Sequence, residues 1–433
     1  MFPNPQAALP LPPHPNLERY KKIAKDLVKA CKSDQSDAIR HWSEAFVETL
    51  VRLAGLKITP ELPVRTRSWI VQVEEFARRK LGDGATCALA DAQFVIARSH
   101  GFASWPKFSQ HLESLAHSSS SEHRFEAAAD AIVAGDAATL ERLLGEEPGL
   151  VHARSSREHG ATLLHYVSAN GVEGYRQKTP KNIVQIAEIL LEAGAEIDAT
   201  ADVYGGGCTT LGLAATSVHP EHAGVQEALL RLLLDHGAAT DMPSSAGNQH
   251  SLVTACLANG RPKAAEYVAR RGAPLNLEAA AGLGRLDTVK TLLQSQTDPE
   301  RLKRAFLVAC EYGHNPVVEL LMDQVGDLTA HCGDGQTGLH LAVIGGQPDT
   351  VKLLLRHDAP LEARNMYGGT VLGQTLWSAA HGGAPETYLE ILELLAGAGA
   401  LIPERHIRVN DPIDQWLERH GSRVEPAWSW QEE

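Results

Sequence analysis

Apolar residues recur at helical spacing along most of the chain. In residues 186–195, 229–238 and 349–359 they fall at positions i, i+3 and i+4, which is one face of an α-helix. Each stretch follows a shorter run of small residues, and several end at a glycine such as Gly194, as a left-handed helix terminus prefers. The pattern predicts helix pairs that bury their apolar faces only by stacking on neighbouring pairs, which makes a solenoid.

Two short motifs recur in fixed order. Residues 335–345 read Gly-Gln-Thr-Gly-Leu-His-Leu-Ala-Val-Ile-Gly and precede a leucine-rich helix at 349–359, and an earlier copy spans 160–171 and 186–195. These residues resemble the ankyrin repeat, whose pattern is Gly-x-Thr-Pro-Leu-His-x-Ala followed by a Leu-Leu-Leu helix. We count about eight repeats of about 31 residues, close to the roughly 33 of the family. They begin near Phe125, Gly160, Gly207, His250, Leu277, Ala305, Gly335 and Gly369.

The repeats differ along the array. Repeats four to six lack the Gly-x-Thr turn, so we expect their projecting β-hairpin fingers to be short or missing. His165 and His340 occupy the histidine position of the repeat motif, where we expect a structural role.

Both flanks of the repeats also read as helical. Residues 16–31, 37–53, 66–81 and 88–99 are amphipathic, and Ser104 precedes a further helix start. Residues 89–108 resemble a small helical module that precedes ankyrin repeats in many bacterial proteins. Near the other end, Asp411 as N-cap, Pro412 and Gly421 bracket a helix that we expect to cap repeat eight.

The predicted fold is therefore all-α: an ankyrin-repeat solenoid preceded by a small helical domain and closed by a C-terminal capping helix. Five segments follow from this reading. They are a flexible proline-rich N-terminus (1–15), a helical module (16–116), a serine-rich linker (117–123), ankyrin-type repeats (124–400) and a C-terminal cap and tail (401–433).

Composition narrows the class of protein. Apolar runs are far shorter than the roughly 20 residues of a membrane span, and the start of the chain does not read as a signal peptide. The six cysteines are scattered without a Cys-x-x-Cys pair, which favours buried thiols in a cytoplasmic protein. A net charge of −13 argues against nucleic-acid binding.

Familiar catalytic motifs are missing, so we expect no enzymatic activity, no cofactor and no metal. The glycine-rich run at 205–210 lacks the lysine of a phosphate loop. His219 and His222 are spaced i, i+3, but Pro220 argues against a helical pair of ligands and no third ligand is evident.

Three insertions lengthen the turn between the two helices of a repeat. They lie at residues 172–182 of repeat two, around 217–223 of repeat three and around 381–386 of repeat eight. Binding residues concentrate in loops on rigid scaffolds, although insertions are also tolerated as drift at an exposed edge. The first two loops form a candidate site for a small anionic ligand, built from Tyr175, Arg176, Lys178, His219, Glu221 and His222.

Repeats three and eight share a variant Tyr-Gly-Gly turn. It contains Tyr204 or Tyr367 and replaces the motif histidine by Gly212 or Gly373. Either these tyrosines pack on the neighbouring finger, or they face the groove and anchor a partner. We name as candidate partner-binding residues Tyr204, Tyr367, Trp377 and His381.

The ankyrin resemblance implies a scaffold that binds a partner protein through its concave groove and fingers. The alternative is an enzyme or small-molecule-binding protein with a pocket under the insertions of repeats two and three.

Overall fold

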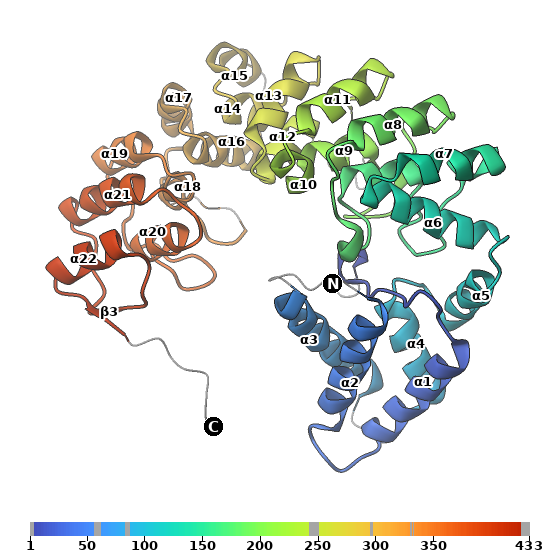
Figure 1. The fold of residues 1–433 in the computed structure, drawn as a ribbon. Coiled ribbons are helices and arrows are strands. Elements are labelled where there is room, and N and C mark those ends of the chain that lie inside the picture. Colours follow the sequence, from blue (N-terminus) through green and yellow to red (C-terminus); the bar gives the residue numbers. More distant parts are fainter. Residues whose placement is uncertain are drawn as a thin grey trace. The chain divides into compact units, whose positions relative to one another are not determined.

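The computed structural model describes residues 4–55, 62–82, 87–241, 251–294, 298–329, 331 and 333–425 (Figure 1). Regular structure in this part of the chain is almost entirely helical, as predicted. The chain divides into two compact units, residues 1–272 and residues 273–433. Among the described residues, no helix combines the length and apolar character that crossing a membrane requires.

The first unit begins with the predicted helical module. A 3-10 turn, η1 (Pro5–Ala7), is followed by five helices: α1 (Leu17–Cys31), α2 (Ala38–Leu53), α3 (Leu62–Leu81), α4 (Leu89–Ser99) and α5 (Trp105–Leu115). Their starts follow the sequence signals, because Asn16 and Ser104 accept hydrogen bonds from the backbone N–H groups of Arg19 and Lys107. The third helix starts at Leu62 rather than Thr66.

The module has an aromatic core. Tyr20, Trp69 and Phe108 are almost completely buried, with Tyr20 and Phe108 in edge-to-face contact at 5.0 Å between ring centroids. Leu9, from the segment that the sequence predicts to be flexible, lies in the same core with 1% of its surface exposed.

The cysteines differ from the sequence prediction at one place in the module. Cys31, at the end of α1, forms a disulfide with Cys87, which precedes α4. Cys208, Cys256 and Cys310 are buried free thiols, as predicted, and Cys332 lies outside the described residues. The prediction of unpaired thiols is therefore wrong for the module, because helix packing brings together two cysteines that are far apart in sequence.

Repeats one to four complete the first unit. Their inner elements, each of which contacts the next, are α6 (Ser121–Ala134), η3 (Leu163–Ser168), α9 (Thr210–Thr216) and α12 (Leu252–Ala258). The outer elements are α7 (Ala137–Glu146), α8 (Ile183–Glu192), α11 (Gln226–Asp235) and α13 (Pro262–Arg270). The connections hold η2 (Pro148–His152), η4 (Gly174–Arg176), α10 (Val218–His222) and the two-stranded pair β1 (Thr200–Ala201) and β2 (Cys208–Thr209).

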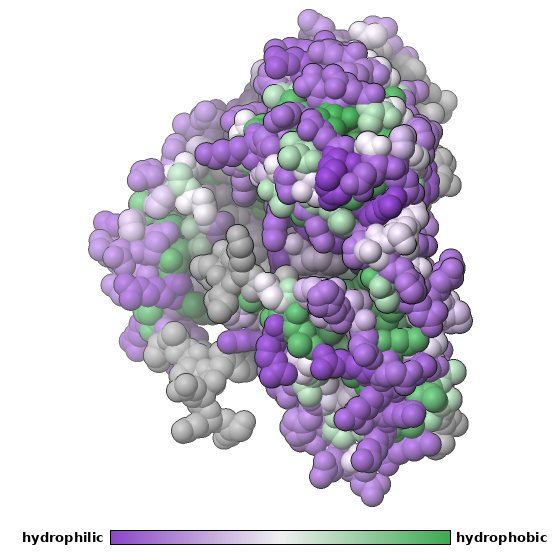
Figure 2. Space-filling view, turned by 45° about the vertical axis from the view of Figure 1, so that its right-hand side comes forward, coloured by the Kyte–Doolittle hydropathy of each residue, from purple (hydrophilic) through white to green (hydrophobic). Residues whose placement is uncertain are grey.

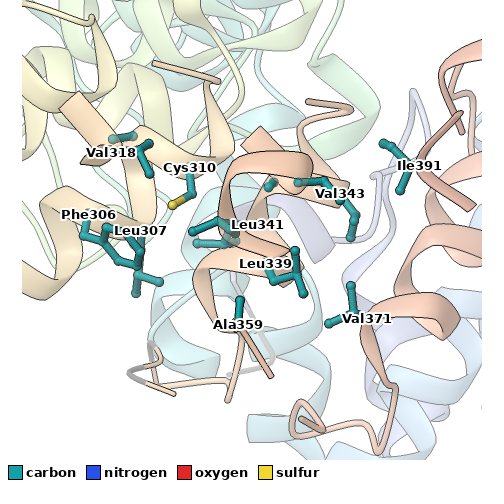
Figure 3. Packing of buried hydrophobic residues seen from close by; sticks show 14 of the residues in the cluster. Phe306, Leu307, Cys310, Val318, Leu339, Leu341, Val343, Ala359, Val371 and Ile391 are labelled. Carbon is teal, nitrogen blue, oxygen red and sulfur yellow. The ribbon is translucent and has the colours of Figure 1, made fainter. Parts of the chain in front are cut away.

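The second unit contains repeats five to eight. Its helix pairs are α14 (Leu277–Gly282) with α15 (Leu286–Leu293), α16 (Pro299–Glu311) with α17 (Asn315–Val325), α18 (Gly338–Ile344) with α19 (Pro348–Arg356), and α20 (Val371–Ala380) with α21 (Pro385–Gly397). Buried residues of successive pairs form one core, in which Phe306, Leu341 and Ile391 lie on consecutive repeats (Figure 3). A Cβ at Gly338 would overlap Phe306, so this glycine lets α16 and α18 approach closely.

The motif histidines link successive repeats. In both copies the ring Nδ1 accepts the backbone N–H of the preceding threonine, Thr162 for His165 and Thr337 for His340. The other ring nitrogen is therefore protonated and donates a hydrogen bond to the next turn. Its acceptor is the carbonyl oxygen of Cys208 (3.3 Å) or Gly369 (3.4 Å). Burial lowers the pKa of both rings, which keeps them neutral for this role.

Fingers occur where the Gly-x-Thr motif is present. Backbone pairs join Arg154 to Thr162, Thr200 to Thr209 and His331 to Thr337. Between residues 251 and 329, no strand pairing occurs in the described segments, which agrees with the expectation for repeats five and six. The expected turn of repeat four falls on residues 242–250, outside the described residues.

A last helix, α22 (Asp411–Arg419), packs on α21 and buries Ile413, Trp416 and Leu417. The sequence predicts Asp411 as its N-cap. The N-cap is instead Asn410, whose side chain accepts a hydrogen bond from the N–H of Ile413. Two short parallel strands, β3 (Arg405–His406) and β4 (Arg423–Val424), flank the helix.

Candidate functional site

The insertion of repeat two folds back on repeat one instead of projecting as a loop. Arg176, at the end of η4, is 5% exposed, and its guanidinium contacts two carboxylates of α6. Its Nη1 lies 2.8 Å from Glu126 Oε2, and its Nη2 lies 2.8 Å from Asp130 Oδ1. This predicted ligand-binding arginine is therefore held by intramolecular ion pairs.

A second buried arginine joins the same cluster. Arg157, from the finger of repeat two, places Nε 2.9 Å from Glu173 Oε1 and also pairs with Glu126. Glu173 lies in the insertion and is completely buried. We refer to Glu126, Arg157, Glu173 and Arg176 as the buried ion network.

The two guanidinium groups keep both carboxylates ionised. Burial by itself would raise the pKa of Glu126, but Arg157 and Arg176 overcome this effect and hold it at about 2. The same balance, with help from His159, keeps the pKa of Glu173 well below its usual range. Two positive and two negative charges thus compensate each other, which a set of charges this deeply buried requires.

Arg157 of the network and the adjacent Glu158 also join the helical module to the repeats. The Arg157 guanidinium lies over the Phe102 ring, 5.4 Å from its centroid, and the N–H of Glu158 donates to the carbonyl of Gly101 at 2.9 Å. Arg98 of α4 forms an ion pair with Glu158. These contacts identify the network as a structural junction between the module and repeats one and two.

The remaining loop candidates have different partners. Lys178 is exposed, whereas the Tyr175 ring lies beneath the Arg176 guanidinium at 5.5 Å. The sequence predicts a loop for the segment with His219, Glu221 and His222. This prediction is wrong, because the segment forms the short helix α10. Glu221 forms an ion pair with Arg261 at 2.8 Å.

The described residues contain no group of three or more His, Cys, Asp or Glu side chains placed to hold a metal ion. Burial, together with His222 and Arg65, lowers the pKa of His219. Arg65 comes from α3 and also donates to the carbonyl of Gly174 at 3.3 Å. The module therefore reaches the insertion of repeat two, which the sequence did not indicate.

The two variant turns are not equivalent. Tyr204 has a left-handed backbone (φ 52°), and its hydroxyl donates to Asn170 Oδ1 at 2.7 Å while accepting from the Gln6 amide. Tyr367 has no such backbone, and 80% of its surface is exposed. The first tyrosine thus ties its turn to repeat two, and the second projects from repeat eight.

The other two partner candidates lie on repeat eight near the end of α20. Trp377 is 59% exposed and stacks on His381 at 4.1 Å between ring centroids. The turn before α20 is held by Asn365, whose Oδ1 accepts the N–H groups of Tyr367 and Gly369. Met366 beside it is 66% exposed. The face of the molecule drawn in Figure 2 is mostly hydrophilic, with apolar patches between the polar residues.

Sequence reasoning missed Glu126, Arg157 and Glu173. The available signal was the spacing of Glu173 and Arg176 within one insertion, which places two opposite charges on one turn. Nothing in the sequence pairs them with α6, because that contact arises only when the insertion folds back.

A comparison with protein families agrees with this architecture. A family model for ankyrin repeats in three copies matches residues 277–365 and, overlapping them, residues 306–404. These residues cover α14 to α21, the four helix pairs of the second unit. The family match therefore shows ankyrin repeats over residues 277–404.

Proposed function

We propose that this protein is a protein-interaction scaffold that binds its partner through Met366, Tyr367, Trp377 and His381, here called the repeat-eight patch. Ankyrin repeats in general support partner binding, and the patch specifies a place for it. The observation that carries the proposal is the exposure of two large aromatic side chains, Tyr367 and Trp377, on one repeat.

The chemistry of the patch suits a protein partner. Tyrosine and tryptophan contribute most to binding energy at protein interfaces, since each buries a large area with few rotatable bonds. The backbone of the Tyr367 turn is held by Asn365, and the Trp377 ring is held by stacking on His381. Little conformational entropy is lost when a partner covers such groups.

Tyr204 is not part of the proposed patch, because Asn170 and Gln6 already bind its hydroxyl. The alternative small-molecule pocket has weaker support. Its central cation, Arg176, would have to leave Glu126 and Asp130 to bind an anion.

The test uses the full chain and one matched control. Proteins retained from a lysate of the cell of origin are compared for wild type, Tyr367→Ala/Trp377→Ala and Ile407→Ala, in which an exposed apolar residue of the same unit is removed. We expect the double variant to lose a protein that wild type and the control both retain. With that protein purified, its Kd should rise at least tenfold for the double variant, in keeping with two interface anchors.

Equal binding by all three chains, at unchanged melting temperatures, would reject the repeat-eight patch as the partner surface.

A further inference from the structure

The chain's own N-terminal segment, residues 4–9, occupies the junction between the helical module and repeats two and three. The Leu9 N–H donates to the carbonyl of Ser99 at 2.8 Å, and the Leu9 carbonyl lies 3.0 Å from His100 Nδ1. The side chain of Leu9 enters the module core, and Ala8 beside it is completely buried. One residue thus supplies both backbone contacts and the apolar anchor.

Earlier residues of the segment contact the repeats. The Gln6 side-chain amide donates to the Tyr204 hydroxyl, and the Gln6 backbone carbonyl lies against Gly174 in the insertion of repeat two. A Cβ at position 174 would overlap that carbonyl oxygen. Gly174 does not have a left-handed backbone conformation. A glycine is needed there because the segment approaches too closely to leave room for a Cβ atom.

These contacts are those of a short peptide bound to a receptor: backbone hydrogen bonds, one apolar side chain in a pocket, and close approach at a glycine. The receptor groups are held independently of the segment. Ser99 and His100 end α4, and Gly174 begins the turn that the ion pairs of Arg176 fasten to α6.

The segment does not fill the space between its walls. An open cavity of about 670 Å³ lies on one side, lined by Arg65, Trp69 and Gln72 of α3 together with Gly174 and the segment. A smaller cavity of about 190 Å³ lies on the other side, where Arg157, Asp202 and Tyr204 face the segment. A peptide with larger side chains than Gln6 and Ala7 has room to bury more surface here.

We infer that this junction is a peptide-binding groove, that residues 4–9 occupy it as an internal ligand, and that it accepts a partner peptide of the same chemistry, with a small residue followed by leucine. Residues 10–15 include Pro10, Pro12, Pro13 and Pro15, so the tether to α1 is not helical and the segment can leave without unwinding a helix. The groove lies in the first unit and is independent of the repeat-eight patch.

The experiment measures binding of a fluorescent peptide of residues 1–14 to the full chain by anisotropy. Three chains are compared: wild type, Leu9→Asp, whose own segment cannot place a carboxylate in the module core, and His14→Asp, which adds the same charge at an exposed position. We expect the Leu9→Asp chain to bind the peptide at least tenfold more tightly than the other two. The same peptide carrying Leu9→Asp should bind none of them.

A fourth chain, Leu9→Asp/Gly174→Ala, separates the groove from nonspecific binding to an opened module. The added Cβ blocks the place of the Gln6 carbonyl, so this chain should lose the peptide binding that Leu9→Asp gains. A folded Leu9→Asp chain that does not bind the peptide, or equal binding with and without Gly174→Ala, would overturn the proposal.

If Leu9→Asp fails to fold, hydrogen exchange of the wild-type chain tests whether the segment leaves the groove. An occupied groove requires the Leu9 amide to exchange through a local opening, faster than the amides of α4. Exchange of the Leu9 amide only on global unfolding would make the segment a fixed part of the module and refute the inference.

Discussion

Single buried residues decide several properties of this protein. The motif histidines are neutral links between repeats, the buried ion network is compensated within itself, and Gly174 is small because a carbonyl lies against it. Glu311, which is half-buried, is a further such residue, since partial burial raises its pKa to about 7.

Glu311 makes the stability of the second unit depend on pH. Its pKa is higher in the folded chain (about 7) than the ordinary value of 4.5, so the folded state binds a proton that the unfolded state releases. Stability should therefore fall as the pH rises from 4.5 to 7, by up to about 1.4 kcal/mol per pH unit, and stay at that lower level above pH 7.

Substitution tests this directly. Glu311→Gln should raise the melting temperature by a few degrees at pH 8 and leave it unchanged at pH 4.5. Glu319→Gln, an exposed change on the next helix, serves as the control. A gain of the same size at both pH values would show that Glu311 acts through packing rather than through its charge.

At the scale of elements, each helix pair depends on its neighbours for burial. Inner elements contact inner elements and outer helices contact outer helices along both units. The terminal pair needs a cover of its own, and α22 supplies it by burying one apolar face on α21.

Removing the largest side chain of this cover should destabilise the second unit. Trp416 is 1% exposed, and its indole N–H donates to Glu393 at 2.7 Å. Trp416→Ala should lower the free energy of unfolding by about 3–5 kcal/mol, as measured by urea denaturation, with the exposed Gln415→Ala as control. A loss below about 1 kcal/mol would mean that α22 is not needed to close the array.

At the scale of the whole molecule, different interactions stabilise the interior of each unit. The second unit has a continuous apolar core, whereas the first joins an aromatic module core to the repeats through the buried ion network. Acid should therefore affect the first unit selectively.

The direction of the acid effect on stability follows from Glu126, whose pKa is lowered to about 2 in the folded chain. Its contribution to stability is present above pH 4.5 and is lost as the pH falls towards 2. Glu173→Gln at neutral pH should mimic part of this loss, at about 3–5 kcal/mol, because it leaves two buried guanidinium groups in the network with only one buried carboxylate, that of Glu126.

Hydrogen exchange followed by mass spectrometry resolves the two units. Glu173→Gln should accelerate exchange in α4, α5 and repeats one and two, and leave α14 to α21 unchanged, whereas Lys178→Ala, an exposed change in the same insertion, should alter neither. Uniform acceleration along the chain would contradict a junction confined to the first unit.

The sequence by itself determined the helical class, the ankyrin repeats of the second unit and the loss of fingers in repeats five and six, because periodicity and turn motifs are local properties of the chain. Tertiary structure alone decided where the insertions go. Arg176 and Tyr204 look like free ligand or partner contacts in sequence, yet one pairs with α6 and the other binds Asn170 and Gln6. Ion pairs, disulfides and docked termini join residues far apart in sequence, and which charges meet depends on packing that no local pattern records.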